Sequence, residues 1–410
     1  MFSRIAFLVL VAGATSLHAQ TATPSGSDPY LERAKRVLRQ TPLIDGHNDL
    51  PWRIREDSIA RGNVDAYDLR KRTPGHTDLE RLKQGMVGAQ FWSVYTPGEF
   101  PDSGYARVEL EQIDIARRVI DKYPDRLALA LSPEDIRKDF KQGKIGSLLG
   151  LEGGHAIENS LGALRAYYDL GVRYMTLTHN VTLAWADAAL DSAKHNGLTP
   201  FGDSVVREMN RLGMLVDLSH VSPGTMSDAL NVTRAPVIFS HSGARALVDV
   251  PRNVPDSILR RVTINGGIVM VPFVTGFVSP AVDLYDRSTR PIITDLQRKY
   301  GSDTAAITRE INQWRASHPE PRATLSQVAD QIDYVRKVAG VDHVGVGSDF
   351  DGITEVVQGL EDVSKFPALF AELARRGWSD ADLRKLAGEN FLRVFAQAEA
   401  VAKKLQREER

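Results

Sequence analysis

The sequence contains no cysteine among its 410 residues. Disulfide bonds, Cys-type zinc sites and lipid attachment to a cysteine are therefore excluded, and the fold must be held by its own core, which this length allows. The chain also lacks an excess of charge of either sign, because 51 Lys and Arg stand against 52 Asp and Glu. The net charge of -1 gives no indication of binding to nucleic acid or to an anionic membrane.

Long hydrophobic runs are also scarce. The run IAFLVLVAGA after Arg4 is too short to span a bilayer as a stable helix, and with SLHAQ it forms the pattern of a secretory signal. We expect a signal peptide over 1–19, cleaved near Ala19, and a disordered lead-in over 20–30; an uncleaved anchor is the alternative. The charged tail at 401–410 lacks the hydrophobic segment of a GPI signal. These features predict an exported, periplasmic or secreted protein, soluble after cleavage and without a GPI anchor.

Short apolar segments recur along the chain and alternate with amphipathic stretches. The segments are 42–47, 86–95, 145–153, 172–180, 213–221, 235–242, 266–273 and 341–350. Apolar residues at three-to-four spacing predict helices between them, for example over 108–123, 200–213 and 325–340. Apolar strands that alternate with helices are typical of a parallel sheet covered on both faces, and eight of them favour an α/β fold of the (β/α)8 TIM-barrel type over an open doubly wound sheet.

The domain organisation follows from this alternation. We expect a single catalytic barrel domain over 31–400. The segment at about 280–322 is polar and partly helical, and it fits neither a strand nor a short connection. It is therefore predicted to be an insertion between strands seven and eight.

Side chains that can bind metal ions stand at the C-terminal ends of six predicted strands. In chain order they are His47, Asp49, Glu152, His179, His220, His241 and Asp349. In a barrel these ends converge on one rim, where active sites lie. Each residue alone could be a core histidine or a turn carboxylate, but four of only ten histidines fall at strand ends. Together they indicate a metal site.

The types and number of these ligands favour two metal ions. Imidazole and carboxylate without thiolate suit Zn(II), Mn(II), Co(II) or Fe(II). Two ions about 3.5–4 Å apart that share one carboxylate would use the whole set and would form a hydroxide near neutral pH. Glu152 is the candidate bridge, His47 and Asp49 complete one site, and His220 and His241 complete the other. His155 is close in sequence but is placed on the following loop and is not taken as a ligand.

Several motifs occur together in a fixed order. They are DGHNDLP, GLEGGHAI, RYMTLTHN, LVDLSHVS, VIFSHSGAR, RNVPD and GSDFDG with GLEDVSK, and the similarity around them extends from about Leu43 to Phe395. With these motifs the sequence resembles the membrane dipeptidase (renal dipeptidase) family of binuclear zinc peptidases.

The resemblance implies a (β/α)8 barrel with two zinc ions that hydrolyses dipeptides. Members accept a D-residue at the C-terminal position, and some open β-lactam rings. Matched motif by motif, the resemblance places His47 and Asp49 on one zinc and His220 and His241 on the other, with Glu152 bound to both. It places His179 and Arg252 on the substrate. Asp349 matches the aspartate at the end of strand eight. Arg252 comes from the resemblance alone, in the role of binding the substrate carboxylate.

Other interpretations stay open at this stage. Eukaryotic members carry cysteines and a GPI signal, so their disulfide-linked dimer is not implied here, and the sequence leaves open whether this chain forms a homodimer. Another binuclear amidohydrolase acting on lactams, lactones or phosphoesters is the alternative enzyme. A binding or metal-storage protein is disfavoured, since storage needs neither His179 nor Arg252. Asp349 is assigned to proton transfer, with Asp351 as the competing candidate.

Overall fold

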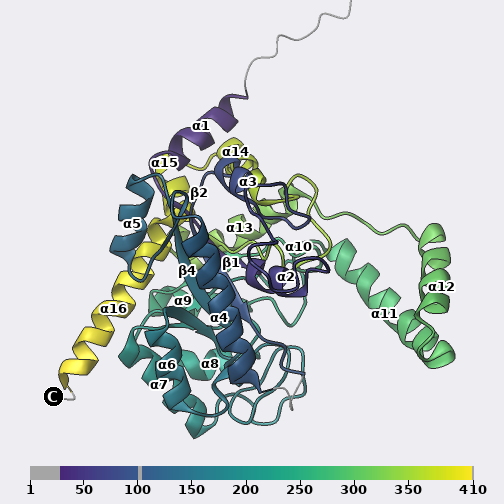
Figure 1. The fold of residues 1–410 in the computed structure, drawn as a ribbon, viewed down its shortest axis with the longest axis horizontal. Coiled ribbons are helices and arrows are strands. Elements are labelled where there is room, and N and C mark those ends of the chain that lie inside the picture. The colour runs from purple at the N-terminus through teal and green to yellow at the C-terminus, as the bar shows by residue number, and fades with distance from the viewer. Residues whose placement is uncertain (1–27, 100–103, 409–410) are drawn as a thin grey trace, which may run out of the picture.

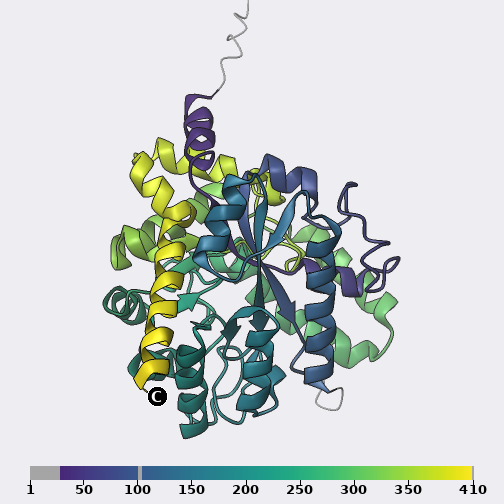
Figure 2. The same cartoon turned by 60° about the vertical axis from the view of Figure 1, so that its left-hand side comes forward.

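The computed structural model describes residues 28–99 and 104–408. The expected signal peptide lies outside the described residues, as does most of the expected lead-in. The strands occupy the centre of the molecule and helices surround them (Figure 1, Figure 2). Within the described ranges, no helix combines the length and the apolar character needed to cross a bilayer.

Eight parallel strands close into a barrel, as the sequence predicted. They are β1 (Leu43–Asn48), β2 (Val87–Tyr95), β4 (Ile145–Glu152), β5 (Val172–Thr176), β6 (Leu215–Asp217), β7 (Ile238–Phe239), β8 (Ile268–Val271) and β9 (Val344–Val346). The ring closes because β1 pairs with both β2 and β9, and β2 continues onto β4. The open doubly wound alternative is wrong, because an open sheet has two unpaired edges.

A ninth strand was not predicted. Strand β3 (Leu127–Leu129) pairs in parallel with the first residues of β4 only, from Ile145 to Ser147, and takes no place in the closed ring. The segment RLALAL around it is too short to show a period that separates a strand from a helix or a turn.

Several strands are shorter than the apolar segments that predicted them. Strand β6 ends at Asp217 and β9 at Val346, although the apolar pattern continues toward His220 and Asp349. Both of these residues adopt a left-handed backbone, with φ of 67° and 68°. The chain therefore leaves the ladder just beyond each strand and turns its polar side chains toward the mouth of the barrel.

Three helices, α4, α7 and α13, lie within three residues of the ranges predicted at 108–123, 200–213 and 325–340, and the structure adds the others. The full set is α1 (Pro29–Leu38), α2 (Leu50–Glu56), α3 (Leu79–Gln84), α4 (Tyr105–Lys122), α5 (Pro133–Lys141), α6 (Leu161–Asp169), α7 (Pro200–Leu212), α8 (Pro223–Val232), α9 (Asp256–Asn265), α10 (Thr275–Val278), α11 (Pro280–Tyr300), α12 (Thr304–Ser317), α13 (Leu325–Ala339), α14 (Phe366–Arg375), α15 (Asp380–Arg384) and α16 (Asn390–Glu408). Short 3-10 helices occupy Gly154–Ile157, Val341–His343 and Val363–Lys365, and a π-helical turn occupies Lys385–Glu389.

Helix α7 illustrates how the sequence sets these bounds. The Thr199 side chain accepts a hydrogen bond from the Gly202 amide and so caps the start of the helix. The helix buries Val205 and Met209, four residues apart on one face. It ends at Gly213, whose φ of 86° suits a residue without a side chain.

The insertion lies where the sequence predicted it, between β8 and β9. Helices α11 and α12 extend away from the barrel and meet at their outer ends in a V (Figure 1). Only Val282 and Thr289 of α11 and Ala306 of α12 are fully buried. The pair adds little to the core, and its first turns lie beside the mouth of the barrel.

Candidate active site

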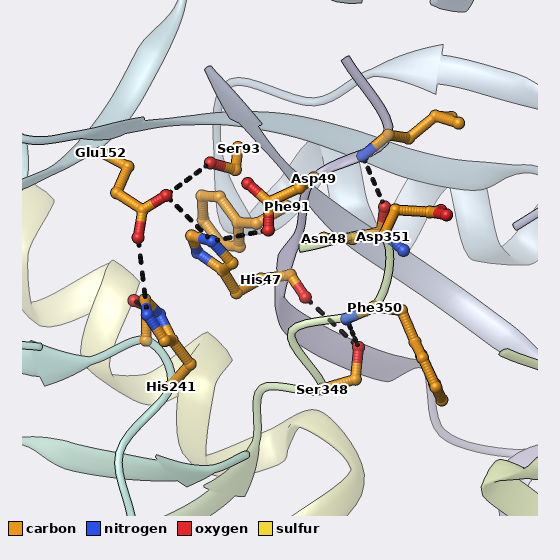
Figure 3. Close-up of polar contacts among 12 residues, drawn as sticks. His47, Asn48, Asp49, Phe91, Ser93, Glu152, His241, Ser348, Phe350 and Asp351 are labelled. Atoms are coloured by element: carbon orange, nitrogen blue, oxygen red, sulfur yellow. Dashed lines mark hydrogen bonds and ion pairs between the residues drawn. The ribbon is translucent and has the colours of Figure 1, made fainter. Parts of the chain in front are cut away.

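The side chains singled out by the sequence gather at the C-terminal mouth of the barrel. Seven of the eight line one cavity of about 390 Å³, namely Asp49, Glu152, His179, His220, His241, Arg252 and Asp349. The eighth, His47, is fully buried and faces the carboxylates of Asp49 and Glu152 (Figure 3). Parallel strands bring these residues together from positions that are up to 302 residues apart in the chain.

Glu152, at the end of β4, stands between two groups of imidazoles. Its Oε2 lies 3.4 Å from His47 Nε2 and accepts a hydrogen bond from the Ser93 hydroxyl at 3.2 Å. Its Oε1 lies 3.0 Å from His220 Nε2 and 3.5 Å from His241 Nε2. One carboxylate thus presents each of its oxygens to a different histidine group, as a bridging ligand requires.

Hydrogen bonds to Nδ1 orient the three imidazoles. His47 Nδ1 donates to the Tyr174 hydroxyl at 2.8 Å, and that hydroxyl donates to the Gly46 carbonyl. His220 Nδ1 donates to Asn180 Oδ1 at 3.2 Å. In a neutral ring with its proton on Nδ1, Nε2 keeps its lone pair for a ligand, which is the arrangement of metal-binding histidines.

His241 is held in the same way through a longer chain of hydrogen bonds. Its Nδ1 donates to the Ser240 hydroxyl at 2.8 Å, and that hydroxyl donates to Asp217 Oδ2 at 2.6 Å. Asp217 is buried within β6 and also accepts from the Ser240 amide. The end of β7 is therefore fixed in position by β6.

The donor atoms fit divalent cations. The Nε2 atoms of His220 and His241 lie 2.9 Å apart, although both carry lone pairs in this tautomer. His47 Nε2 is buried and has no hydrogen-bond partner within the described ranges. Converging lone pairs next to a carboxylate repel one another unless a cation lies between them, so these residues suit a metal pair.

Electrostatics act differently on the imidazoles and on the shared carboxylate. Burial acts to lower the pKa of His47, but Tyr174, Glu152 and Asp49 outweigh burial and raise that pKa well above its ordinary value. Burial lowers the pKa of His220 and of His241 well below the ordinary value, and the Arg252 guanidinium lowers both further. Burial acts to raise the pKa of Glu152, but its contacts with His47 and His220 outweigh burial and hold that pKa well below the usual range. His220 and His241 are therefore neutral and Glu152 is ionised, whereas His47 favours the protonated form, from which a bound cation would displace the proton.

Asp49 and Asp349 face each other across the first group of ligands. Ligand atoms of His47, Asp49 and Asp349 lie within 4.8 Å of one another. A Cβ on Gly352 would stand 2.2 Å from Asp49 Oδ2 and 2.7 Å from Asp349 Oδ1, so only glycine allows this approach. Burial raises the pKa of Asp349 well above its usual value, and Asp49 raises it further; bound cations would oppose that shift.

Asp351, the competing candidate two residues later, also lines the cavity but has different partners. Its Oδ1 accepts a hydrogen bond from the His76 amide at 2.7 Å, and its own amide donates to His76 Nδ1. A Cβ on Gly75 would stand 2.2 Å from the same oxygen. Asp351 therefore anchors the loop that contains His76.

Arg252 brings a buried positive charge to the cavity wall. It is 2% exposed, its guanidinium stacks over the Phe277 ring at 5.3 Å, and it makes no side-chain hydrogen bond or ion pair within the described ranges. Burial lowers its pKa to about 10, partly offset by Asp349. A buried guanidinium without a partner is costly, so its position favours an anionic ligand in the cavity.

His179 also lines the cavity and lies between two rings. Its ring centroid is 4.8 Å from that of Tyr95 and 4.4 Å from that of His220. Its Nδ1 is buried without a hydrogen-bond partner in the part of the chain that the structure describes. His179 and His220 also share a cluster with Glu152, so position alone allows His179 either a ligand or a substrate role. His155 lies outside the site, because its Nε2 donates to the Thr96 carbonyl at 2.6 Å.

Sequence reasoning missed the residues that position the ligands. Trp52 and Tyr95 line the cavity, and Tyr174, Asn180 and Asp217 hold the imidazoles. A signal existed for Asp217, which is a carboxylate inside the apolar run GMLVDLSHV. Nothing in the sequence marks Tyr174, because an aromatic residue in a strand is ordinary core.

A parallel barrel whose mouth gathers imidazoles around a shared, buried carboxylate has the arrangement of a metal-dependent hydrolase. The chain belongs to the membrane dipeptidase family (peptidase family M19), whose family model matches residues 31–409. It is therefore a hydrolase of the dipeptidase type, and the resemblance seen in the sequence is confirmed. The metallopeptidase character of the family agrees with the clusters of His, Glu and Asp described above.

Solved structures with the same architecture support this assignment. The probable dipeptidase PvdM from Pseudomonas aeruginosa is 26% identical with a TM-score of 0.78, over 91% of this chain and 99% of that one. Dipeptidase AC, a metallo peptidase of family M19, is 25% identical with a TM-score of 0.72. The match covers 87% of this chain and 98% of that one. A metallo peptidase from Rhodobacter sphaeroides, liganded with a phosphinate mimic of the dipeptide L-Ala-D-Ala, shares the fold at 24% identity and a TM-score of 0.71. The match covers 87% of this chain and 99% of that one.

Proposed function

We propose that this chain hydrolyses dipeptides, including those with a C-terminal D-residue, with two zinc ions per chain. His47, Asp49 and Glu152 would hold one ion, and Glu152, His220 and His241 the other. The observation that carries the proposal is Glu152, whose Oε2 faces His47 and whose Oε1 faces His220 and His241. When bound, the ions supply a nucleophile by lowering the pKa of water and polarise the scissile carbonyl.

Arg252 binds the substrate carboxylate in this proposal. Its guanidinium is buried, lines the cavity and lacks a protein partner within the described ranges. A carboxylate is the planar anion that a guanidinium recognises with two parallel hydrogen bonds. A dipeptide bound this way has its C-terminal residue beside Arg252 and its peptide bond over the ligand cluster.

Asp349 transfers the proton from the attacking water to the departing nitrogen in this proposal. Hydrolysis adds one water across the peptide bond, so a proton must pass from the attacking water to the departing nitrogen. Asp349 has a ligand atom within 4.8 Å of those of His47 and Asp49, whereas Asp351, which lines the same cavity, uses its Oδ1 to accept from the His76 amide. Its carboxylate accepts the proton during attack and returns it as the carbon–nitrogen bond breaks.

His179 completes the substrate site. It lines the same cavity as Arg252, and its buried Nδ1 has no protein partner within the described ranges. We assign it to the substrate, where an imidazole N–H would donate to the carbonyl oxygen as negative charge develops there.

The cellular setting and the domain limits belong to the same proposal. The N-terminal pattern at 1–19 supports export to a periplasm or the medium, and 31–400 would form one catalytic domain with an insert at about 280–322. Sequencing the N-terminus of protein recovered from the exported fraction tests the export proposal. A mature chain that begins at Met1 would contradict it.

A substrate panel tests the activity. Purified protein is assayed with L-Ala-L-Ala, L-Ala-D-Ala, a lactone and a phosphotriester, each with and without a chelator. We expect hydrolysis of both dipeptides, lost with chelator and restored by Zn2+. Faster turnover of the lactone or the phosphotriester than of either dipeptide would favour the alternative binuclear amidohydrolase.

A further inference from the structure

A cavity of about 720 Å³ opens on the face of the barrel opposite the active site. Val87 and Ile145 line it, and they are the first residues of β2 and β4, whose other ends carry the candidate active site. The C-terminal ends of α1, α3 and α5 contribute Leu38, Lys83 and Lys141. A cavity of this size suits a small ligand, and dipeptide hydrolysis makes no use of it.

The charged side chains that line this cavity are all positive. They are Arg39, Lys83, Arg126, Lys141 and Lys144, and we call the space that they line the basic cavity. Across residues 28–99 and 104–408, none of the five takes part in an ion pair, and Arg126 donates a hydrogen bond to the Leu79 carbonyl at 3.0 Å. The net charge of the whole chain, -1, does not reveal this local excess.

Carboxylates near the basic cavity leave most of this charge unneutralised. Asp139 lies close enough to Lys144 for their charges to interact. Asp125 interacts with Arg126 in the same way, but it already accepts two hydrogen bonds from Arg70. With both carboxylates counted as fully ionised, three of the five positive charges remain in excess. Like charges gathered in one cavity repel one another, so a bound anion would be stabilised there.

The neighbouring surface does not change this balance. A smaller cavity shares Phe140 and Lys141 with the basic cavity and adds Arg137 and Glu389 to its own lining. Glu389 pairs with Arg384 at 3.7 Å. The one carboxylate on this side is therefore matched by an arginine outside the basic cavity.

Apolar side chains form most of the remaining lining of the basic cavity. Leu38, Val87 and Ile145 are buried, whereas Met86 and Phe140 are half-buried and keep part of their surface exposed. A ligand in the basic cavity would therefore contact apolar surface and positive charge together.

We propose that the basic cavity binds a phosphate monoester that carries an apolar group. Such a phosphate has a charge of about -1.5 to -2 at pH 7, which offsets more of the positive excess than the single charge of a carboxylate. Arg and Lys are the side chains that bind phosphate, and the apolar group would lie against Met86 and Phe140. Free phosphate esters and the headgroups of some lipids share this chemistry.

Calorimetric titration of the full chain with octyl phosphate, below its critical micelle concentration, tests the inference. Inorganic phosphate lacks the apolar group, and octyl glucoside lacks the charge. We expect octyl phosphate to bind at least about tenfold more tightly than either, because burial of a few methylene groups is worth more than that factor.

Paired substitutions locate the binding. Lys83→Gln with Lys141→Gln removes two exposed charges from the basic cavity, and we expect about twofold to thirtyfold weaker binding, the size of two partly solvated ion pairs. Lys403→Gln with Lys404→Gln on α16 is the matched control, because it changes the net charge equally and lies outside the cavity. The control variant should bind octyl phosphate as wild type does.

Vesicles distinguish the two sources of the ligand. Wild type and both variants are sedimented with phosphatidylcholine vesicles, with and without phosphatidic acid, whose headgroup is a phosphate monoester. Sedimentation that needs phosphatidic acid and falls in the Lys83 and Lys141 variant would identify a lipid headgroup as the ligand. Octyl phosphate binding without sedimentation would identify a free phosphate ester.

Three results would overturn the inference. They are no binding of octyl phosphate, equal weakening in the two paired variants, and binding that the Lys83 and Lys141 substitutions leave unchanged, as expected for binding at the active site. Each is a measurement of binding on the face away from the metal ligands, so the proposed dipeptidase activity stands or falls separately.

Discussion

At the scale of single residues, the two aspartates of GSDFDG have different surroundings. Asp349 faces His47 and Asp49 at the cavity, whereas Asp351 binds the backbone of His76. We predict that Asp349→Asn keeps both metals and lowers kcat by about 10²–10⁴-fold, because the amide cannot carry the proton. Metal analysis and steady-state kinetics on the same preparation measure this.

Asp351→Asn is the matched control for that substitution. It removes a carboxylate that holds a loop, so it should cost stability and leave kcat much closer to wild type. If Asp349→Asn retains two metals and a near-normal kcat, proton transfer lies elsewhere. If it loses one metal, Asp349 is a ligand of the first site.

Arg252 should govern recognition of the free C-terminus. We predict that dipeptide amides are poor substrates and that Arg252→Ala mainly raises KM for the free acid, with kcat/KM lower by at least about 30-fold. This corresponds to about 2 kcal/mol, the lower end for truncating one partner of a buried charge pair. Equal kcat/KM for acid and amide in wild type would remove Arg252 from that role.

At the scale of elements, the insertion is separable from the metal centre. Residues 320–323 and Thr275 line one common cavity, so the chain returns close to the start of the insertion. We predict that deleting 283–320 with a short linker leaves two metals bound and Ala-Ala hydrolysed, since no metal ligand lies in the insertion. Circular dichroism confirms folding, and metal analysis measures the sites. Loss of both metals from a folded deletion variant would contradict the separation.

The sequence predicted those elements whose formation depends on a local pattern of residues. Apolar runs alternating with helices predicted all eight barrel strands and the position of the insertion, and strand ends predicted His47, Glu152 and His241. The features that the sequence did not predict depend on tertiary contacts. The short strand β3 is stabilised by its pairing with β4, and Arg252 lies on a loop whose path no periodicity indicates. The cavity that α11 forms with the barrel depends on the angle between them, which no local sequence pattern determines.

At the scale of the whole molecule, ion pairs between helices should make stability depend on pH. Glu208 of α7 accepts hydrogen bonds from Arg211 and from Arg165 of α6, and these guanidinium groups, Arg211 first, lower its pKa below 4.5. A carboxylate with a lowered pKa stabilises the fold above about pH 4.5, and that contribution is lost as pH falls through the lowered pKa.

The Glu208→Gln variant tests this dependence. We predict that it unfolds with about 0.5–1 kcal/mol less free energy than wild type at pH 7, as expected for partly exposed arginines. The difference should shrink below pH 4.5, because wild type then loses the same charge. Thermal unfolding of both proteins across pH 3–7 measures it. Parallel Tm profiles throughout that range would show that the ion pairs contribute nothing.

The central claim is that Glu152 joins two metal sites, and zinc titration of chelator-treated protein tests it most directly. Bound zinc per chain and Ala-Ala hydrolysis are measured together as zinc is added. We predict saturation at two equivalents, with full activity only as the second equivalent binds. Saturation at one equivalent with full activity would contradict the binuclear account.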